Sequence, residues 1–325
     1  MDNRKQELLE FVRQKYQDQS LELDSLNGDA SFRRYFRVKT KQLIAVDSPP
    51  ATQKNHEFHA IDVALSKFGI KVPAILAEDL DRGFFVLEDL GDKMFADAAT
   101  GGSQKKYYLK AADLLPVLAG VNDDSVVLPE FDYNFIMTEL TLFRTWMLEK
   151  KLGINLSPDE VRSLHDCFEY ISDRILSQQY VSMHRDFHSR NLMVCADGSL
   201  GVIDFQDMVH GPVTYDLASL IYDCYVNLDD SLIGELVSRV YNKFKSIRII
   251  SELSKEQFVS DLNITSLQRH IKVLGIFCRL SIRDGKDGYL ADLPRVIDYC
   301  LKESSLDPNC SALTELLKCY VVDRF

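Results

Sequence analysis

The chain has 325 residues, of which 46% are hydrophobic and 27% charged, enough for one large folded domain or two smaller lobes. Lys and Arg number 38 against 49 Asp and Glu, and the resulting net charge of −11 argues against a nucleic-acid partner. The seven cysteines form no CxxC pair, and no apolar run approaches the roughly 18 residues of a membrane span. We therefore expect a cytoplasmic protein with reduced thiols and no membrane partner. Its oligomeric state is left open.

The elements predicted for the first 90 residues are mostly short strands. Apolar residues at helical spacing predict a helix over 2–17, and a turn at 27–29 precedes strands over 32–38 and 43–46. Residues 55–67 again have helical spacing. Two further strands are predicted over 74–79 and 83–87, joined by a polar turn.

The rest of the chain has a different character. From residue 104 onward helical periods dominate, and one β-like patch interrupts them between Met183 and Phe205. The chain therefore divides into a mostly β part, residues 1–90, and a mostly α part, residues 91–325. This order predicts an α+β fold with two lobes and not an alternating βαβ sheet.

The segment 183–207, MHRDFHSRNLMVCADGSLGVIDFQD, has the most informative spacing in the chain. Asn191 follows Asp186 by five positions and opens an apolar run. A tight turn is predicted at 197–198, and the second apolar run ends at Asp204. Such a hairpin brings Asn191 and Asp204 to the same end of two paired strands. The spacing matches the HRDxxxxN catalytic loop and the metal-binding Asp of the kinase fold.

Phosphoryl transfer requires this set of side chains. A carboxylate must orient the attacking hydroxyl, and oxygen ligands must hold the Mg²⁺ that clamps the phosphates. We therefore predict that Asp186 is the catalytic carboxylate and that Asn191 and Asp204 bind Mg²⁺ beside ATP. The fold would be protein-kinase-like. Residues 1–90 would form the nucleotide-covering N-lobe, and residues 91–325 the C-lobe with the catalytic loop, the metal site and the substrate pocket.

Three residues near this segment have predicted supporting roles. His184 is expected to brace the catalytic loop and not to transfer protons. His188 either supports the loop from behind or meets the substrate, and the sequence does not separate these roles. Asp216 opens a helical pattern. We expect its carboxylate to hold the backbone of the catalytic loop, and a helix cap is the alternative.

Two segments are predicted to contact ATP from their position in the chain. Glu88, Asp89 and Leu90 join the two lobes, and we expect them to offer backbone groups to the adenine. Residues 27–34 would lie over the phosphates, although they contain one glycine and match neither GxGxxG nor GxxxxGK[ST].

The expected phosphate-binding lysine is missing. Asp47 stands where the strand motif V-A-I-K places that lysine. Another cation must take its role, and Arg33, Arg34 and Arg37 are the nearest candidates. Strand alternation puts Arg34 on the face opposite Arg33 and Arg37, and we choose Arg34.

The motifs together resemble the aminoglycoside/choline phosphotransferase superfamily, which is protein-kinase-like. They resemble most closely the branch of bacterial N-acetylmuramate/N-acetylglucosamine anomeric kinases. The similar segments include GDASFRRYFRV (28–38), VDSPP (46–50), VLEDLGD (86–92), HRDFHSRNLMV (184–194) and GVIDFQDMVHGPVTYDLASL (201–220). That branch also resembles this chain in lacking the strand lysine, at the position of VDSPP. The resemblance implies an enzyme of peptidoglycan recycling that uses ATP to phosphorylate the anomeric hydroxyl of an amino sugar, giving the sugar 1-phosphate.

Two other functions stay open. One is a phosphotransferase that acts on an aminoglycoside, choline or another alcohol. The other is a nucleotide-binding pseudokinase that serves as a regulatory module, an idea motivated by the missing lysine. The presence of all three predicted catalytic and metal residues argues against the pseudokinase.

A basic stripe on a late predicted helix bears on the substrate. Arg269, Lys272, Arg279 and Arg283 fall within about 80° of one another at roughly 100° per residue. Such a stripe suits a neutral or anionic sugar better than a cationic aminoglycoside, and a solvated helix face is the alternative. Because arginine can bind a carboxylate in bidentate fashion, Arg279 or Arg283 is the candidate for substrate recognition.

Overall fold

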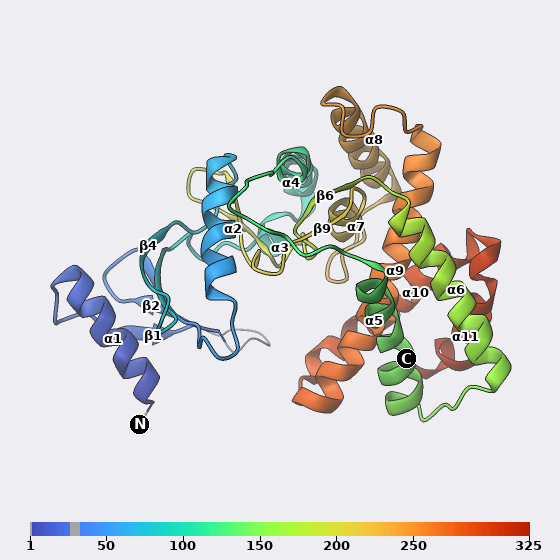
Figure 1. The fold of residues 1–325 in the computed structure, drawn as a ribbon, viewed down its shortest axis with the longest axis horizontal. Helices are drawn as coiled ribbons and strands as arrows, with labels where there is room; N and C mark the ends of the chain where they lie inside the picture. The colour runs from blue at the N-terminus through green and yellow to red at the C-terminus, as the bar shows by residue number, and fades with distance from the viewer. Residues whose placement is uncertain (1, 27–32) are drawn as a thin grey trace. The chain divides into compact units, whose positions relative to one another are not determined.

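The structure is a computed structural model that describes residues 2–26 and 33–325 (Figure 1). The chain forms two compact units. Unit 1 comprises Met1–Val127 and Arg190–Met208, and unit 2 comprises Leu128–Ser189 and Val209–Phe325. The boundary expected at residue 90 therefore falls inside unit 1. The α+β expectation is confirmed, since a small antiparallel sheet near the amino terminus precedes a mostly helical remainder.

Unit 1 is built on a five-stranded antiparallel sheet with the strand order β1-β2-β3-β5-β4. The strands are β1 (Leu23–Ser25), β2 (Arg34–Val38), β3 (Leu43–Asp47), β4 (Ile75–Asp79) and β5 (Phe84–Glu88). Strands β2 to β5 confirm the sequence prediction. Strand β1 was not predicted, because three residues are too short to show an alternating pattern.

A helix covers each face of this sheet. On one face α1 (Asn3–Tyr16) buries Leu8, Phe11 and Val12 in a hydrophobic cluster with residues of β2, β3 and β5. On the other face α2 (Asn55–Lys67) places Phe58 against Phe85 of β5, with 5.3 Å between the ring centroids. Figure 1 shows α1 and α2 on opposite sides of the strands. Side chains that alternate along β2 therefore meet different helices.

The predicted hairpin also belongs to unit 1. It consists of β7 (Leu192–Val194) and β8 (Leu200–Val202), and its turn has Gly198 at a φ of 76°, a conformation that glycine adopts without strain. Backbone bonds tie β7 to Lys93 at 2.8 Å and β8 to Lys71 at 2.8 Å. Two helices complete this unit, α3 (Phe95–Ala98) and α4 (Gln104–Ala119).

Unit 2 is helical around α9 (Lys255–Asp284), which is 30 residues long. This helix packs against α5 (Tyr133–Leu142), the π-helical turn η2 (Phe143–Lys151), α6 (Pro158–Leu176), α7 (Tyr215–Ile221) and α10 (Leu293–Ser305). The remaining helices are α8 (Asp230–Ser246) and α11 (Ser311–Tyr320). Within the described parts of the chain, no helix is long and apolar enough to cross a membrane.

Unit 2 also contains a strand pair that corrects the sequence prediction of a single β patch. Strands β6 (Tyr180–Met183) and β9 (Val209–Pro212) are antiparallel, and Met183 pairs with Val209. Strand β9 was missed because Gly211 and Pro212 indicate a turn in the sequence. The pair places the residues after Met183 beside those that lead into α7.

Candidate active site

Buried carboxylates hold both ends of the loop that follows β6 in unit 2. Asp216 of α7 accepts hydrogen bonds from the backbone N–H groups of His184 at 2.7 Å and Arg185 at 2.9 Å. Asp216 thus bonds the loop and not the end of its own helix, whose cap position is Thr214. Asp223 is fully buried and accepts from the N–H of Ser189 at 2.9 Å.

These tethers maintain a strained backbone. Arg185 has a φ of 78°, in the left-handed region that costs a non-glycine residue about 1–2 kcal/mol. Burial raises the pKa of Asp216 to about 6, although His184 and the two N–H donors lower it. His184 is buried, and its Nδ1 accepts from the N–H of Asp186 at 3.3 Å. The loop is thus preorganised by groups buried beneath it. Asp223 escaped the sequence analysis because no motif or periodic pattern marks it.

Asp186 lies at the middle of this loop with its side chain 41% exposed. Its Oδ1 is 4.0 Å from the Nζ of Lys272, a residue of α9. Burial raises the pKa of Asp186, but Lys272 first and Arg185 second outweigh burial, so the pKa lies below the ordinary range. The carboxylate is therefore ionised at neutral pH.

His188, on the same loop, is half-buried. Its Nδ1 has no hydrogen-bond partner among the described residues, and its ring meets Tyr225 edge-on at 5.4 Å. Burial lowers the pKa of His188, and the opposing effect of Asp223 does not cancel this. The His188 imidazole is therefore neutral, and its Nδ1 is a buried nitrogen that the described residues leave unsatisfied.

The basic stripe of α9 divides into two environments. Arg269 and Lys272 are each 2% exposed, whereas the side chain of Arg283 is 57% exposed and bonds Asp284 through Nε at 2.8 Å. Arg279 lies between these extremes, and its Nε is buried with no hydrogen-bond partner in the described part of the chain. A solvated face therefore describes Arg283, but it is wrong for Arg269 and Lys272. Helices surround the middle of α9, and residue spacing alone does not reveal this.

In unit 1 the hairpin ends bring together the two predicted metal ligands. The N–H of Ile203 bonds the carbonyl of Asn191 at 3.0 Å, which aligns Asn191 with Asp204. Asp204 is exposed and its Oδ1 accepts from Gln206 Nε2 at 2.7 Å. Gln206 was not assigned a role from the sequence.

These donors suit Mg²⁺ that arrives with a nucleotide. Among the described residues, no group of three or more His, Cys, Asp or Glu side chains could hold a metal ion by itself. Magnesium keeps several waters and takes one or two carboxylates plus substrate phosphates. One carboxylate and one amide oxygen at the same end of a hairpin therefore fit a magnesium–nucleotide complex and not a metal bound by protein alone.

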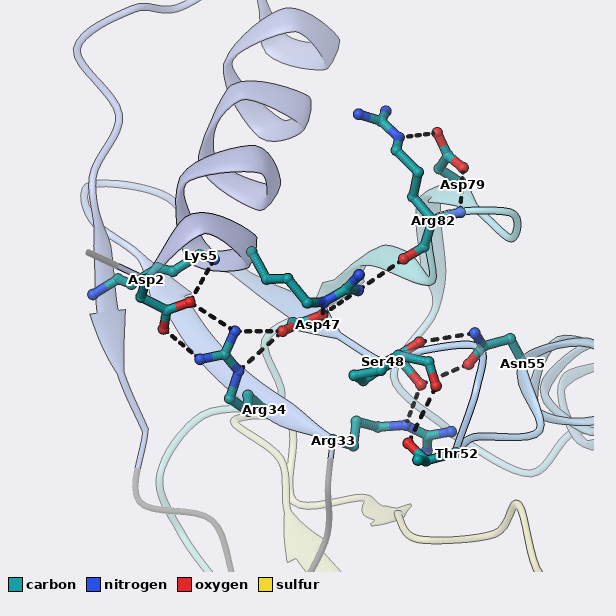
Figure 2. Close-up of polar contacts among 12 residues, drawn as sticks. Asp2, Lys5, Arg33, Arg34, Asp47, Ser48, Thr52, Asn55, Asp79 and Arg82 are labelled. Carbon is teal, nitrogen blue, oxygen red and sulfur yellow. Dashed lines mark hydrogen bonds and ion pairs between the residues drawn. The ribbon is translucent and has the colours of Figure 1, made fainter.

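The arginines at the start of β2 point to different partners (Figure 2). Arg34 bonds Asp47 through Nε at 2.9 Å and through Nη2 at 2.6 Å, and it also bonds Asp2. Asp47 is fully buried and accepts a further bond from Arg4 of α1 at 2.8 Å. Asp47 is thus the anchor of two arginines on the α1 face of the sheet.

Arg33 lies on the other face and is 3% exposed. Its Nε donates to Ser48 Oγ at 3.0 Å, and its guanidinium lies 4.6 Å from the centroid of the Phe58 ring. Its Nη1 donates to Oε1 of Gln206, the residue that bonds Asp204, at 3.0 Å. Arg33 is thus joined through Gln206 to Asp204, whereas Asp47 and Asp2 occupy the guanidinium of Arg34. The predicted alternation of the two arginines between the sheet faces is found, and this geometry makes Arg33 a better candidate than Arg34 for the phosphate-binding cation.

The third candidate, Arg37, is engaged by carboxylates near the end of β5. It bonds Asp89 at 2.6 Å and Asp92 at 2.7 Å. The N–H of Glu88 bonds Ala74 O at 2.9 Å, and that of Asp89 bonds Gln42 O at 3.2 Å. Leu90 packs closely on Gly201, where an added Cβ would lie 2.5 Å from Leu90 Cδ1. Of the predicted phosphate loop 27–34, residues 27–32 lie outside the described residues.

Comparison with known proteins identifies the family of the chain. Residues 22–242 match the model of the phosphotransferase enzyme family. The chain is 36% identical to the N-acetylmuramate/N-acetylglucosamine kinase of Pseudomonas aeruginosa over 298 residues, covering 91% of this chain and 88% of that protein. It is 32% identical to the kinase of the same name from Neisseria meningitidis serogroup B, covering 93% of this chain and 92% of the relative.

Solved structures share the fold at low sequence identity. A choline/ethanolamine kinase family protein from Mesorhizobium loti has a TM-score of 0.64 at 14% identity, covering 96% of this chain and 99% of that one. The ADP-bound aminoglycoside phosphotransferase APH(2'')-Ib has a TM-score of 0.59 at 14% identity, covering 90% and 97%. These neighbours confirm the protein-kinase-like fold class, and the matched family model and the relatives show that the chain belongs to the phosphotransferase enzyme family.

Proposed function

We propose that this chain is a cytoplasmic kinase that transfers the γ-phosphoryl group of ATP to the anomeric hydroxyl of N-acetylmuramate or N-acetylglucosamine. The product would be the sugar 1-phosphate, in the context of peptidoglycan recycling. The observation that carries the proposal is the similarity to kinases of that name over about nine-tenths of the chain. The tethered loop around Asp186 supports the phosphotransferase chemistry.

Asp186 would orient the sugar hydroxyl and accept its proton. The sugar oxygen forms a bond to the γ-phosphorus as the bond from that phosphorus to the β-phosphate oxygen breaks. A carboxylate with a lowered pKa is a weak base, which suits a loose transition state in which the proton moves late. The tethers from Asp216 and Asp223 preorganise the loop for this role.

Asn191 and Asp204 would be the magnesium ligands, and Gln206 would orient the Asp204 carboxylate. Bound Mg²⁺ would neutralise charge on the phosphate oxygens. Arg33 would supply the phosphate-binding cation in place of the absent lysine. Its partners Ser48 and Phe58 hold it on the α2 face of the sheet, where it also bonds Gln206.

The adenine would meet the segment of Glu88, Asp89 and Leu90. The N–H groups of Glu88 and Asp89 already bond other strands or loops. The main chain of Leu90 is therefore our choice for the adenine contact. Its side chain would remain packed beneath on Gly201.

For the sugar we propose His188 and Arg279 as contacts. The Nδ1 of His188 is buried without a partner in the described part of the chain, and a sugar hydroxyl would satisfy it. The guanidinium of Arg279, whose Nε is also buried and left unsatisfied by the described residues, would bind the lactyl carboxylate that distinguishes N-acetylmuramate. Arg283 is less suited to this role because Asp284 already occupies its guanidinium.

An acceptor assay tests the proposed function. Wild-type protein with Mg·ATP should phosphorylate N-acetylmuramate and N-acetylglucosamine, with the phosphate at the anomeric carbon by NMR, and should leave kanamycin and choline unchanged. Asp186→Asn should lower kcat by about 10²- to 10⁴-fold with nucleotide affinity preserved. Turnover of kanamycin or choline above that of both sugars would contradict the proposal.

A comparison of the two sugars tests whether Arg279 determines substrate specificity. Losing a charge-assisted hydrogen bond costs about 1.5–3 kcal/mol, so Arg279→Ala should lower kcat/KM for N-acetylmuramate by about 10- to 150-fold. The value for N-acetylglucosamine should change little. Equal losses on the two sugars would show a structural role for Arg279.

A further inference from the structure

Lys272 is the lysine of the basic stripe, and it is buried within unit 2. Its side chain is 3% exposed, and its Nζ donates to the hydroxyl of Tyr215 at 2.8 Å. The same Nζ is 3.9 Å from Oε1 of Glu139 and 4.0 Å from Oδ1 of Asp186. Three helices and the loop therefore meet around one ammonium group: α5, α7, α9 and the segment that carries Asp186.

Glu139 is engaged mainly by other groups. It is 4% exposed and accepts from Arg185 at 2.7 Å and from Gln268 at 2.9 Å. Arg185 thus pairs with Glu139 at 2.7 Å, and Lys272 forms an ion pair with Asp186 at 4.0 Å. Burying an ammonium group costs free energy unless it is paired with an anion or a hydrogen-bond acceptor. The hydroxyl of Tyr215 and the stem of Lys272 together fix where that charge lies.

The charges around this lysine agree with that assignment. Burial lowers the pKa of Lys272, but Glu139 and then Tyr215 and Asp186 outweigh burial and hold the pKa above its ordinary value. Burial raises the pKa of Tyr215 to about 12, so its hydroxyl stays protonated and accepts from the ammonium. The lysine is a permanent cation and not a proton carrier.

We propose that Lys272 is a positioning residue for phosphoryl transfer, which holds the negative charge and the orientation of the Asp186 carboxylate as it meets the acceptor hydroxyl. The proposal rests on the proposed function for the nature of the acceptor. Lys272 acts through Asp186 and does not contact the sugar. It lies 86 positions further along the chain, on a helix, so no loop motif indicates it.

Kinetics of two replacements test the role. Lys272→Met removes the charge and keeps the stem, and it should lower kcat by about 10- to 10³-fold while the KM values for sugar and ATP change less than about threefold. Lys272→Arg restores the charge and should recover a substantial part of the lost kcat. Lys255→Met is the matched control: Lys255 is an exposed lysine of the same helix that bonds Ser238, and its replacement should leave kcat unchanged.

A second variant guards against misfolding. The double variant Glu139→Gln/Lys272→Met removes one buried negative charge and one buried positive charge together. The charges of Asp186 and Arg185 that remain still cancel, so no net charge is left buried. This pair should fold with a native circular dichroism spectrum and remain as slow as Lys272→Met. A kcat within threefold of wild type in either variant would overturn the proposal. Equal losses in the Arg and Met variants, each with a lowered Tm, would show a structural role and overturn it too.

A measurement without sugar separates this inference from the proposed function. The Asp186 carboxyl can be followed by ¹³C NMR with labelled aspartate and assigned by Asp186→Asn. The pH midpoint of the Asp186 titration should rise in Lys272→Met and not in Lys272→Arg. An unchanged midpoint in Lys272→Met would overturn the inference. The other groups that face this site stay in place: Glu139 of α5, Arg185 and His188 of the loop, Tyr215 of α7 and Arg269 of α9. Wild-type protein that phosphorylates neither sugar would contradict the proposed function alone.

Discussion

Asp62 is a buried carboxyl of α2 in unit 1 that lacks a full set of partners. It is 3% exposed, and its Oδ2 has no hydrogen-bond partner in the described residues. Burial raises its pKa to about 7, while His59 lowers it and Glu78 raises it further. The folded state thus binds this proton more tightly than the unfolded chain. The stabilising contribution is complete below the ordinary pKa and is lost as pH rises through about 7.

We predict that Asp62→Asn flattens the pH dependence of stability. Between pH 5 and 8 the wild-type free energy of unfolding should decrease, and the variant should lose part of this slope and be more stable at pH 8 by about 1–3 kcal/mol. Urea unfolding at several pH values measures this. Glu57→Gln is the control, since Glu57 is exposed on the same helix. An unchanged slope in Asp62→Asn would show that Asp62 stays ionised in the fold.

The two neighbouring arginines should separate catalysis from stability. Arg33→Met should raise the KM for ATP by about 10- to 100-fold, because the proposed charge-assisted contact to phosphate would be lost. Arg34→Met should leave this KM nearly unchanged and lower the free energy of unfolding by about 1–3 kcal/mol, because buried Asp47 then keeps Arg4 alone as an arginine partner among the described residues. Both variants are measured by steady-state kinetics and by urea unfolding. The reverse pattern would return the phosphate role to Arg34.

At the scale of elements, α9 is buried on all sides along its middle. The helix packs so closely against η2 and α5 that Gly275 lies next to the backbone of Leu142. A Cβ added at Gly275 would lie 2.4 Å from the carbonyl carbon of Leu142. This contact explains a glycine in the interior of a 30-residue helix, where it otherwise costs about 1 kcal/mol relative to alanine. Close packing of α9 also places Lys272 and Arg269 beside the loop.

Gly275→Ala should therefore destabilise unit 2 despite its better helix propensity. Overpacking against a backbone atom typically costs about 1–3 kcal/mol, more than the gain of about 1 kcal/mol in propensity. Gly234→Ala in α8 is the matched control, because an added Cβ there meets nothing within 4 Å. That control should be neutral or gain up to about 1 kcal/mol. Denaturant midpoints for the two variants compare them directly, and a stabilised Gly275→Ala would show that α9 can move away from α5.

The predicted elements were found wherever local spacing was strong. Helices α1 and α2, strands β2 to β5 and the β7–β8 hairpin follow from periodicity and turn residues. Strands β7 and β8 are equally short, but the turn at 197–198 marks them as a hairpin, whereas β1, β6 and β9 have three or four residues each and too little pattern of their own. Their pairing depends on partners elsewhere in the chain, so the local sequence does not predict them.

At the scale of the whole molecule, nucleotide binding should be linked to stability. A ligand that binds only the folded state at 100 times its Kd adds about 2.7 kcal/mol to the free energy of unfolding. A non-hydrolysable ATP analogue with Mg²⁺ should therefore raise the Tm by a few °C. Asp204→Ala should abolish the magnesium-dependent part of this rise and keep the ligand-free Tm near wild type. Calorimetric scans with EDTA in place of Mg²⁺ provide the control, and an undiminished rise in Asp204→Ala would exclude Asp204 as a metal ligand.

The sequence by itself determined the α+β class, the kinase-like motif and the candidate residues Asp186, Asn191 and Asp204. These are matters of local spacing, since a loop of five residues and a hairpin turn are specified by the residues within them. The family resemblance also depends on such short segments.

Only the tertiary structure decided which side chains share an environment. It put Arg33 and not Arg34 on the face with Gln206, and it placed Lys272 4.0 Å from Asp186. It also showed Asp47 to be a buried anchor for arginines. Burial, ion pairing and the resulting pKa shifts depend on residues far apart in the chain, and the physical cause is the packing of helices and strands against one another.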